Sequence, residues 1–234
     1  MRATVLETRE VAKGTLLVIF AVDAYPEYRP GAYFWVELPD RGLDDEKGLH
    51  RHVSLVTSPT ETGVVGLATR LRDTAFKRTL AGLEVGDEVE VEEPKGSFLL
   101  PEDTSVDYVF VAGGIGITVF RSMLRYIADE NRPYRVTLVY SNRDRESAAF
   151  LDELDELKGR IDGLTVVLTM TEDEGWEGES RRIDAAMLRE LLGGLDDKQF
   201  LVAGPPAMTE AVVEALHAAG VREDRVLADK FSGY

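Results

Sequence analysis

The chain changes its pattern of secondary structure near residue 104, and this change constrains the fold more than any other feature. The first hundred residues contain six short runs rich in β-branched and aromatic residues, each bounded by Gly, Pro or Asp. The runs are TVLETREVA, TLLVIFAV, AYFWVEL, HVSLVTS, VVGLATRL and DEVEVEEP. Six short strands over this length predict a small antiparallel barrel or sandwich, with one short helix over residues 74–83.

Strand-like and helix-like segments alternate in the rest of the chain. The strand-like segments are YVFVAGG, RVTLVYS, LTVVLTM, QFLVAGPP and RVLADKF. Such alternation predicts a doubly wound, five-stranded parallel sheet. Between the last two segments, apolar residues recur at helical spacing from Met208 to Leu216, and Gly220 stands where that helix should end. We therefore expect a β-barrel domain over residues 1–103 and an α/β domain over residues 104–234.

Composition excludes several classes of function. The absence of cysteine excludes disulfides, thiol nucleophiles and cysteine-bound zinc or iron–sulfur clusters in this sequence. A net charge of −16 argues against binding to nucleic acid. No stretch approaches the roughly 20 apolar residues of a membrane span. The polar start, MRATVLETRE, does not have the pattern of a secretory signal, so we expect a cytoplasmic protein.

Two glycine-containing turns follow strands and precede helices. The first, in VFVAGGIGITVF, contains Gly113, Gly114 and Gly116, and the second lies in VAGPPAM at residues 202–208. Such turns present backbone N–H groups at a positive helix end, where a pyrophosphate is stabilised. Glycine can equally serve only to relieve strain in a tight turn. We expect the two strands to be neighbours, so that both turns border the crevice where such sheets bind ligands.

The first turn does not match the usual dinucleotide fingerprint. Counted from Gly114, the third position of G-x-G-x-x-G is occupied by Val119, and no acid follows the second strand. A P-loop is also excluded, because no Gly-Lys-Ser/Thr follows. An ordinary dehydrogenase is therefore disfavoured.

The order of motifs resembles the ferredoxin–NADP reductase superfamily over nearly the whole chain. RHVS at residues 51–54 is similar to the flavin motif Arg-x-Tyr-Ser, and GGIGIT and AGPPAM are similar to the dinucleotide motifs. The resemblance implies that Arg51 binds a flavin phosphate, and that Ser54 lies at the flavin N5, which receives hydride. His52 and Val53 complete this motif, and Val53 replaces the tyrosine that packs on the flavin ring.

Further site residues are implied by the same resemblance. TRLRDTAFKRTL resembles the segment that takes the flavin pyrophosphate, and the expected N–H donors are at residues 74–77. In this segment the residues expected to bind the cofactor are Thr69, Arg70, Thr74, Ala75, Phe76 and Lys77. Many relatives carry serine at the place of Lys77. The C-terminal segment DKFSGY implies that Phe231 or Tyr234 covers the flavin face where nicotinamide stacks.

The resemblance also implies a nicotinamide dinucleotide in the C-terminal half. The expected contacts are Gly113, Gly114, Gly116, Thr118, Gly204, Pro205 and Met208. Ser141 and Arg143 could bind a 2′-phosphate, and together with the missing acid they favour NADP(H) over NAD(H). Relatives often have cysteine in place of Ala203, so a thiol contact to nicotinamide is excluded here.

We therefore expect a flavoenzyme that takes hydride from NAD(P)H onto FAD, with Ser54 and Phe231 at the reacting rings. The electron acceptor could be a ferredoxin-like protein, a partner subunit or a small molecule. An alternative is a non-catalytic or electron-relay subunit that binds flavin. In that case Val53 and Ala203, which replace a tyrosine and a cysteine of relatives, would indicate that the protein no longer oxidises NAD(P)H. A third alternative is an α/β enzyme that binds another phosphate ligand in the glycine turns.

Overall fold

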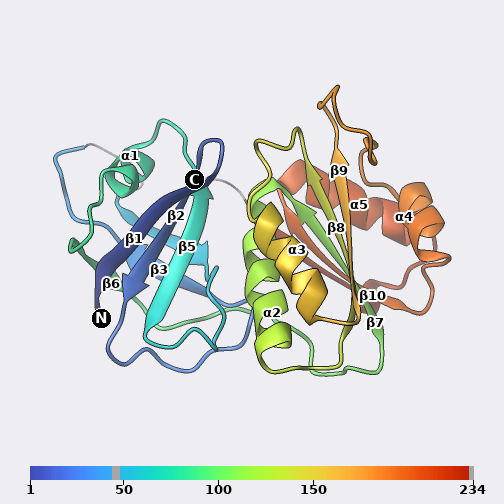
Figure 1. The fold of residues 1–234 in the computed structure, drawn as a ribbon, viewed down its shortest axis with the longest axis horizontal. Helices are drawn as coiled ribbons and strands as arrows, with labels where there is room; N and C mark the ends of the chain where they lie inside the picture. Colours follow the sequence, from blue (N-terminus) through green and yellow to red (C-terminus); the bar gives the residue numbers. More distant parts are fainter. Residues whose placement is uncertain (44–47, 232–234) are drawn as a thin grey trace.

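Two β-sheets, one on each side of residues 92–106, organise the chain and lie side by side (Figure 1). The computed structural model describes residues 1–43 and 48–231, so Tyr234 lies outside the described residues. The predicted domain boundary at residues 103 and 104 falls between the two sheets and stays a prediction.

The N-terminal sheet is antiparallel and has six strands in the order β4-β3-β6-β1-β2-β5. Its strands are β1 (Arg2–Ala12), β2 (Thr15–Ala21), β3 (Tyr33–Glu37), β4 (His50–Ser54), β5 (Val64–Arg70) and β6 (Glu88–Val91). The ladder does not close between the edge strands β4 and β5, although the Val56 N–H donates to the Gly66 carbonyl at 2.9 Å just beyond β4. The predicted six-stranded antiparallel unit is thus confirmed as a barrel-like sheet with one open side.

A short helix, α1 (Ala75–Ala81), follows β5 and matches the helix predicted from the sequence. Thr74 caps the helix, because its hydroxyl oxygen accepts a hydrogen bond from the Lys77 N–H at 3.3 Å. Phe76 and Leu80 bury one face of α1 in the core of the sheet. Lys77, which lies on the same helix, is also buried.

The C-terminal sheet is parallel and has five strands in the order β11-β10-β7-β8-β9. Its strands are β7 (Asp107–Gly113), β8 (Arg135–Asn142), β9 (Leu164–Met170), β10 (Lys198–Gly204) and β11 (Val226–Lys230). The helices are α2 (Ile117–Asp129), α3 (Leu151–Arg160), α4 (Ala185–Leu192) and α5 (Pro206–Ala218), with 3-10 turns η1 (Gly114–Gly116) and η2 (Glu223–Arg225). This confirms the predicted doubly wound sheet.

Helices cover both faces of the parallel sheet, as Figure 1 shows. Phe110 and Leu138 pack with α2 and α3 on one face, whereas Val109, Val111 and Val202 pack with α4 and α5 on the other. Burial on both faces explains why β7 is a continuous apolar run rather than an alternating one. Within the described residues, no helix is long and apolar enough to cross a membrane.

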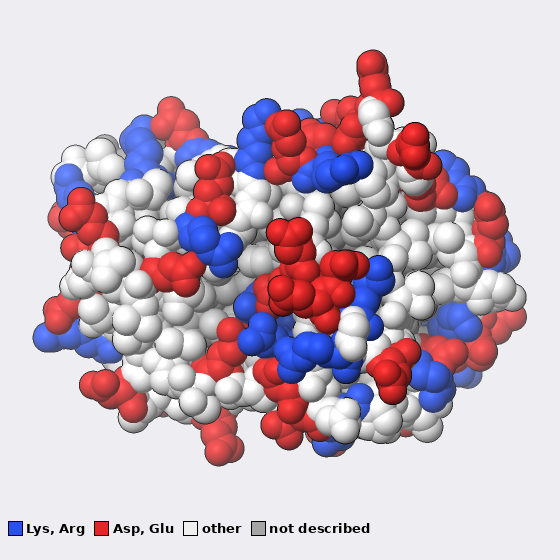
Figure 2. All heavy atoms as spheres, viewed as in Figure 1, with Lys and Arg blue, Asp and Glu red and all other residues white. Residues whose placement is uncertain are grey.

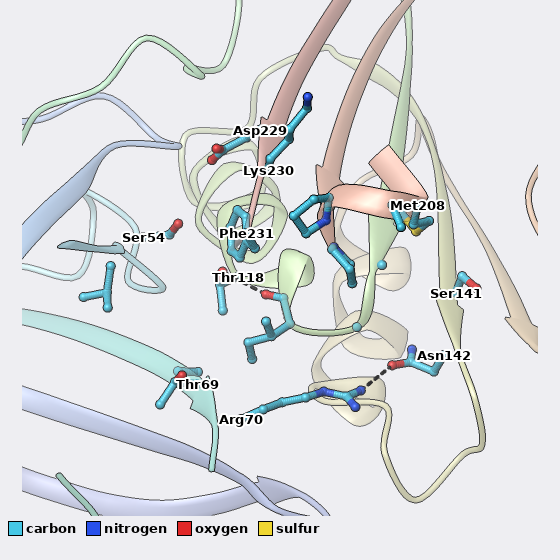
Figure 3. A pocket seen from close by; sticks show the side chains of 18 of the residues that line it. Ser54, Thr69, Arg70, Thr118, Ser141, Asn142, Met208, Asp229, Lys230 and Phe231 are labelled. Atoms are coloured by element: carbon cyan, nitrogen blue, oxygen red, sulfur yellow. Dashed lines mark hydrogen bonds between the residues drawn. The ribbon is translucent and has the colours of Figure 1, made fainter. Parts of the chain in front are cut away.

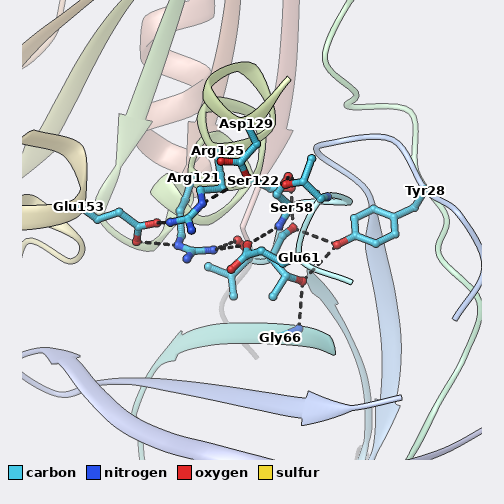
Figure 4. A network of polar contacts seen from close by, with 12 residues as sticks. Tyr28, Ser58, Glu61, Gly66, Arg121, Ser122, Arg125, Asp129 and Glu153 are labelled. Atoms are coloured by element: carbon cyan, nitrogen blue, oxygen red, sulfur yellow. Dashed lines mark hydrogen bonds and ion pairs between the residues drawn. The ribbon is translucent and has the colours of Figure 1, made fainter. Parts of the chain in front are cut away.

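A buried polar network joins the two halves (Figure 4). Arg121 on α2 donates to the Val56 carbonyl at 2.6 Å and to the Glu61 carboxylate at 3.1 Å, both in the N-terminal half. It also donates to Glu153 on α3 at 2.8 Å. Ser122 adds a hydrogen bond to the Thr57 carbonyl at 2.7 Å. Because Arg121 is only 9% exposed, these contacts hold α2 against the segment that follows β4.

Candidate functional site

A cleft of about 910 Å³ lies between the two halves and is lined by both. Figure 3 shows Ser54 and Thr69 on one side of it and Met208 and Ser141 on the other, with Thr118 and Phe231 between them. Strand β7 pairs with β10 in parallel, with Ala112 opposite Ala203, so the two glycine turns leave neighbouring strands as the sequence predicted. This is the crevice where doubly wound sheets bind ligands.

Most residues predicted for the site meet in this cleft. Those that line it are Arg51, His52, Val53, Ser54, Thr69, Arg70, Phe76, Lys77, Gly113, Gly114, Thr118, Ser141, Arg143, Pro205, Met208 and Phe231. Thr74, Ala75, Gly116 and Gly204 do not line it.

Gly116 has a structural reason for being glycine. A Cβ there would lie 2.3 Å from the Ala203 carbonyl oxygen, so only glycine lets η1 pack against β10. Gly113 and Gly114 differ, since they line the cleft itself. Gly114 has φ +51° and a Cβ would lie 3.2 Å from the Arg70 guanidinium, which leaves bare backbone facing the open space.

Two of the four expected backbone donors at the start of α1 make hydrogen bonds within the protein. The Thr74 N–H donates to the Arg72 carbonyl at 2.9 Å, and the Lys77 N–H donates to the Thr74 hydroxyl. That the N–H groups of residues 74–77 bind a pyrophosphate stays a prediction. Phe76 and Lys77 of this helix line the cleft.

Strand β4 divides its side chains between two faces. Arg51 and Val53 point to one face, where Arg51 is 6% exposed and its guanidinium carbon lies 5.5 Å from the centre of the Phe76 ring. His52 and Ser54 point to the other face. Ser54 pairs with Tyr33 on β3, and the His52 ring contacts Tyr33 at 5.5 Å between centroids.

Several residues of the cleft were not predicted from the sequence. Tyr33 and Trp35 come from β3, Asn142 from the end of β8, and Thr171 and Arg182 from beyond β9. An alternating strand next to the Arg-x-Tyr-Ser-like strand could have indicated the two aromatic residues. Nothing local in the sequence identifies the other three.

Arg70 reaches from the N-terminal half to the end of β8. Its guanidinium donates to the Ser147 carbonyl at 3.3 Å and to the Asn142 side-chain oxygen at 3.5 Å (Figure 3). Asn142 is 4% exposed, and its side chain also interacts with the buried hydroxyl of Tyr140.

The last strand brings an acid and an aromatic ring to the cleft. The Phe231 N–H donates to the Gly204 carbonyl at 2.8 Å, which fixes Phe231 beside the second glycine turn. Burial raises the pKa of Asp229, and nearby His52 partly opposes the shift. Lys230 points outward enough to pair with Glu210 at 2.8 Å.

The cleft is strongly basic although the chain is acidic overall. Among its described lining residues, Asp229 is the only carboxylate. The lining cations are Arg51, Arg70, Arg72, Lys77, Arg143, Arg182 and Lys230. This charge suits a polyanionic ligand, and the volume suits a large cofactor. No group of three or more His, Cys, Asp or Glu residues that could hold a metal occurs among residues 1–43 and 48–231.

Comparisons with known proteins agree with this arrangement. Residues 110–214 match the family described as oxidoreductase NAD-binding domain. The reductase component of propane 2-monooxygenase from Rhodococcus jostii (strain RHA1) is 28% identical over 214 residues, which are 88% of this chain and 56% of that protein. The chain thus spans about half the length of the curated relatives it matches.

Two solved structures match almost end to end. The FAD/NAD-binding domain of nitric oxide dioxygenase from Vibrio cholerae has a TM-score of 0.86 and 22% identity, and the match covers 98% of both chains. A ferredoxin NADP+ reductase from Neisseria gonorrhoeae with bound FAD and NADP has a TM-score of 0.82 and 19% identity, covering 100% and 98%. The chain therefore has the two-part fold of these two structures, and residues 110–214 of its C-terminal half are similar to the oxidoreductase NAD-binding domain.

Proposed function

We propose that the protein is an NAD(P)H-dependent flavin reductase that passes electrons to a further acceptor. The observation that carries the proposal is the shared cleft, in which the Arg51–Ser54 strand and both glycine turns border one basic space. Two nucleotide cofactors need such a space, because each brings negative phosphates and a flat ring. A bound FAD would accept hydride from the reduced dinucleotide and supply the redox chemistry.

The N-terminal wall of the cleft would hold FAD. Arg51 offers a planar, five-donor group suited to a phosphate, and its burial against Phe76 fixes its direction. Ser54 would hold or polarise the reacting edge of the ring, and Thr69 and Arg70 would border the flavin from β5. Val53 offers no aromatic stack, so the ring would depend on its other contacts.

The C-terminal wall would hold the dinucleotide. The bare backbone at Gly113 and Gly114 and the turn at Pro205 and Met208 would follow its pyrophosphate. Thr118 already donates its hydroxyl to the Ile115 carbonyl at 3.0 Å, which leaves its oxygen as an acceptor. The protein's task is to align the two rings at roughly 3–3.5 Å and to exclude water.

We infer a preference for NADPH over NADH. Ser141 lies at the end of β8 and Arg143 follows it, where an acid would otherwise bind the ribose 2′-hydroxyl, and Arg182 also lines the cleft. The cleft has no carboxylate at this place within the described residues. A 2′-phosphate would thus meet only neutral and positive groups.

The acceptor would be a protein, a partner subunit or a small molecule. The propane monooxygenase relative is named as a reductase component, and another matched structure is the ferredoxin reductase of carbazole 1,9a-dioxygenase. On the face seen in Figure 2, acidic side chains gather over α3, which contains Asp152, Glu153, Asp155 and Glu156. An acidic ferredoxin would therefore have to approach another face, and its reaction rate would depend steeply on salt.

One specific observation favours a second function. Val53 and Ala203 lack the aromatic ring and the thiol that many relatives have at these places. A subunit that binds flavin without oxidising NAD(P)H would tolerate both changes.

The experiment is reconstitution of the purified protein with FAD, followed by anaerobic addition of NADPH or NADH. The proposal expects a yellow protein whose flavin colour bleaches with one equivalent of dinucleotide. A flavin that binds but is not reduced above the rate of free FAD would favour the non-catalytic subunit. A protein that binds neither FAD nor FMN would overturn both.

A further inference from the structure

The protein buries two long cationic side chains in very different surroundings. Arg121 is 9% exposed and Lys77 is 5% exposed. Arg121 lies between the carboxylates of Glu61 and Glu153, and although burial opposes it, their charges raise its pKa (Figure 4). Lys77 makes no ion pair with any residue in the part of the chain that the structure describes. A buried charge is costly unless an opposite charge accompanies it.

The surroundings of Lys77 are positive rather than negative. Its amine donates one hydrogen bond, to the Arg70 carbonyl at 2.7 Å, which leaves donor capacity for another partner. Burial, and secondarily the nearby Arg72, lower the pKa of Lys77 to about 8. Lys77 also lines the cleft that a ligand would occupy. The missing counter-charge is therefore expected from outside the protein.

We propose that Lys77 is the counter-charge for a phosphate group of the flavin, and that flavin binding draws a proton onto its amine. This inference rests on the proposed function, because it assigns a residue to the flavin site. Phosphate is the chemistry that an ammonium group with free donors recognises. The serine common in relatives at this place could donate a hydrogen bond but could not titrate.

Flavin phosphate is the favoured source of the anion over the dinucleotide pyrophosphate. Lys77 belongs to α1 in the N-terminal half and follows Phe76, whose ring lies beneath the Arg51 guanidinium. Arg51 and Lys77 thus form two cations on one wall. The bare glycine turns that suit the dinucleotide belong to the other half.

The direction of the pH effect follows from the charge. Above about pH 8 the free protein has a neutral amine at Lys77, so binding an anion there must also take up a proton. Flavin affinity should therefore be constant from pH 7 to about 8 and should fall above it. At pH 9, one unit above this pKa, the Kd should be about tenfold higher than at pH 7.

The other charged groups near Lys77 do not produce this change. Arg51 on β4, Arg70 on β5 and Arg72 in the following turn are arginines, which stay protonated in proteins. Asp73 before α1 pairs with Arg78 at 2.5 Å. Burial, opposed in part by Asp229, lowers the pKa of His52 below its ordinary value near 6.5, so that it is neutral throughout this range.

The test measures the Kd of FMN, FAD and riboflavin by fluorescence at pH 7, 8 and 9. Lys77→Met should raise the Kd of FMN and FAD about 10- to 100-fold at pH 7, which corresponds to the loss of one charged hydrogen bond. The Kd of riboflavin should not change, because riboflavin has no phosphate. Lys77→Arg should keep affinity at pH 7 and abolish the rise at pH 9. Arg78→Met removes an exposed cation from the same helix and should behave as wild type.

Three results would overturn the inference. One is a Lys77→Met protein that binds FMN and FAD as tightly as wild type. Another is a rise in Kd at pH 9 that persists in Lys77→Arg. The third is a Lys77→Met protein that binds NADPH more weakly but binds flavin as tightly as wild type. That result would mean that Lys77 binds a phosphate of the dinucleotide instead of the flavin. Failure of the wild-type protein to bind any flavin would instead contradict the proposed function.

Discussion

His52 on β4 and Asp229 on β11 lie close enough across the cleft for each to favour the charged form of the other, although burial acts more strongly in the opposite direction on both. The two residues come from different halves of the chain. Their interaction brings the last strand of the parallel sheet near the strand that carries Ser54. Any ligand held by one half therefore meets side chains of the other.

Asp229→Asn should raise the stability of the protein relative to wild type at pH 7 more than at pH 4. The folded-state pKa of Asp229 is raised by burial, so its stabilising contribution is present below its unfolded pKa near 4 and is lost as the pH rises through the folded value. The difference in Tm between variant and wild type should increase from pH 4 to pH 7 by less than about 4 °C, which corresponds to about 1 kcal/mol. Asp196→Asn, at an exposed position, should give no such trend.

Arg121→Met should destabilise the protein by about 1–3 kcal/mol, because it removes charged hydrogen bonds to the half-buried Glu61 and Glu153. Urea unfolding followed by circular dichroism would measure the loss. Arg222→Met, which breaks a fully exposed pair with Asp224, should cost no more than about 1 kcal/mol. Equal effects of the two substitutions would show that the network does not hold the halves together.

Gly116→Ala should destabilise the protein and weaken dinucleotide binding together. The added Cβ would meet the backbone of Ala203 at 2.3 Å, so the η1 turn and β10 must separate, at a cost of about 1–3 kcal/mol. Gly159→Ala is a suitable comparison, because that position in α3 has open space and should gain up to about 1 kcal/mol. A Gly116→Ala protein with wild-type Tm and wild-type NADPH affinity would contradict the packing role.

Arg143→Ala should distinguish the two dinucleotides. Loss of a charged hydrogen bond to a 2′-phosphate would raise the Kd of NADPH about 10- to 100-fold and leave that of NADH unchanged. Arg145 lies two residues further on, packs on Trp176 and does not line the cleft, so Arg145→Ala should change neither Kd. Calorimetric titration of the flavin-loaded protein would give both values. Equal weakening of the two dinucleotides would remove the argument for NADPH.

Much of the fold was predictable because it depends on local patterns. Alternating residues predict the strands of the first half, and the regular succession of strands and helices predicts a parallel sheet with right-handed connections. Those rules make β7 and β10 neighbours, and so they also bring the two glycine turns together. The sequence patterns did not predict that the first sheet stays open between β4 and β5, because that depends on how these two edge strands are placed in the folded chain.

The site was predictable only where a motif carries it. Arg51 and Ser54 belong to a recognisable strand motif, and Gly113 and Gly114 to a recognisable turn. Tyr33 reaches the cleft only through its pairing with Ser54. In contrast, Asn142 and Arg182 reach it only through the packing of distant segments. The burial of Lys77 without an anion is likewise a property of the folded chain, since a lysine is normally exposed and nothing in the local sequence marks this one as buried.

The most direct test of the central claim is an anaerobic single-turnover measurement of flavin reduction in the FAD-loaded protein, with NADPH deuterated at the transferring position. Rings stacked in one cleft predict rapid bleaching of the bound flavin, slowed by deuterium on one face of the nicotinamide and not on the other. A bound flavin that NADPH and NADH reduce no faster than free FAD would contradict the account.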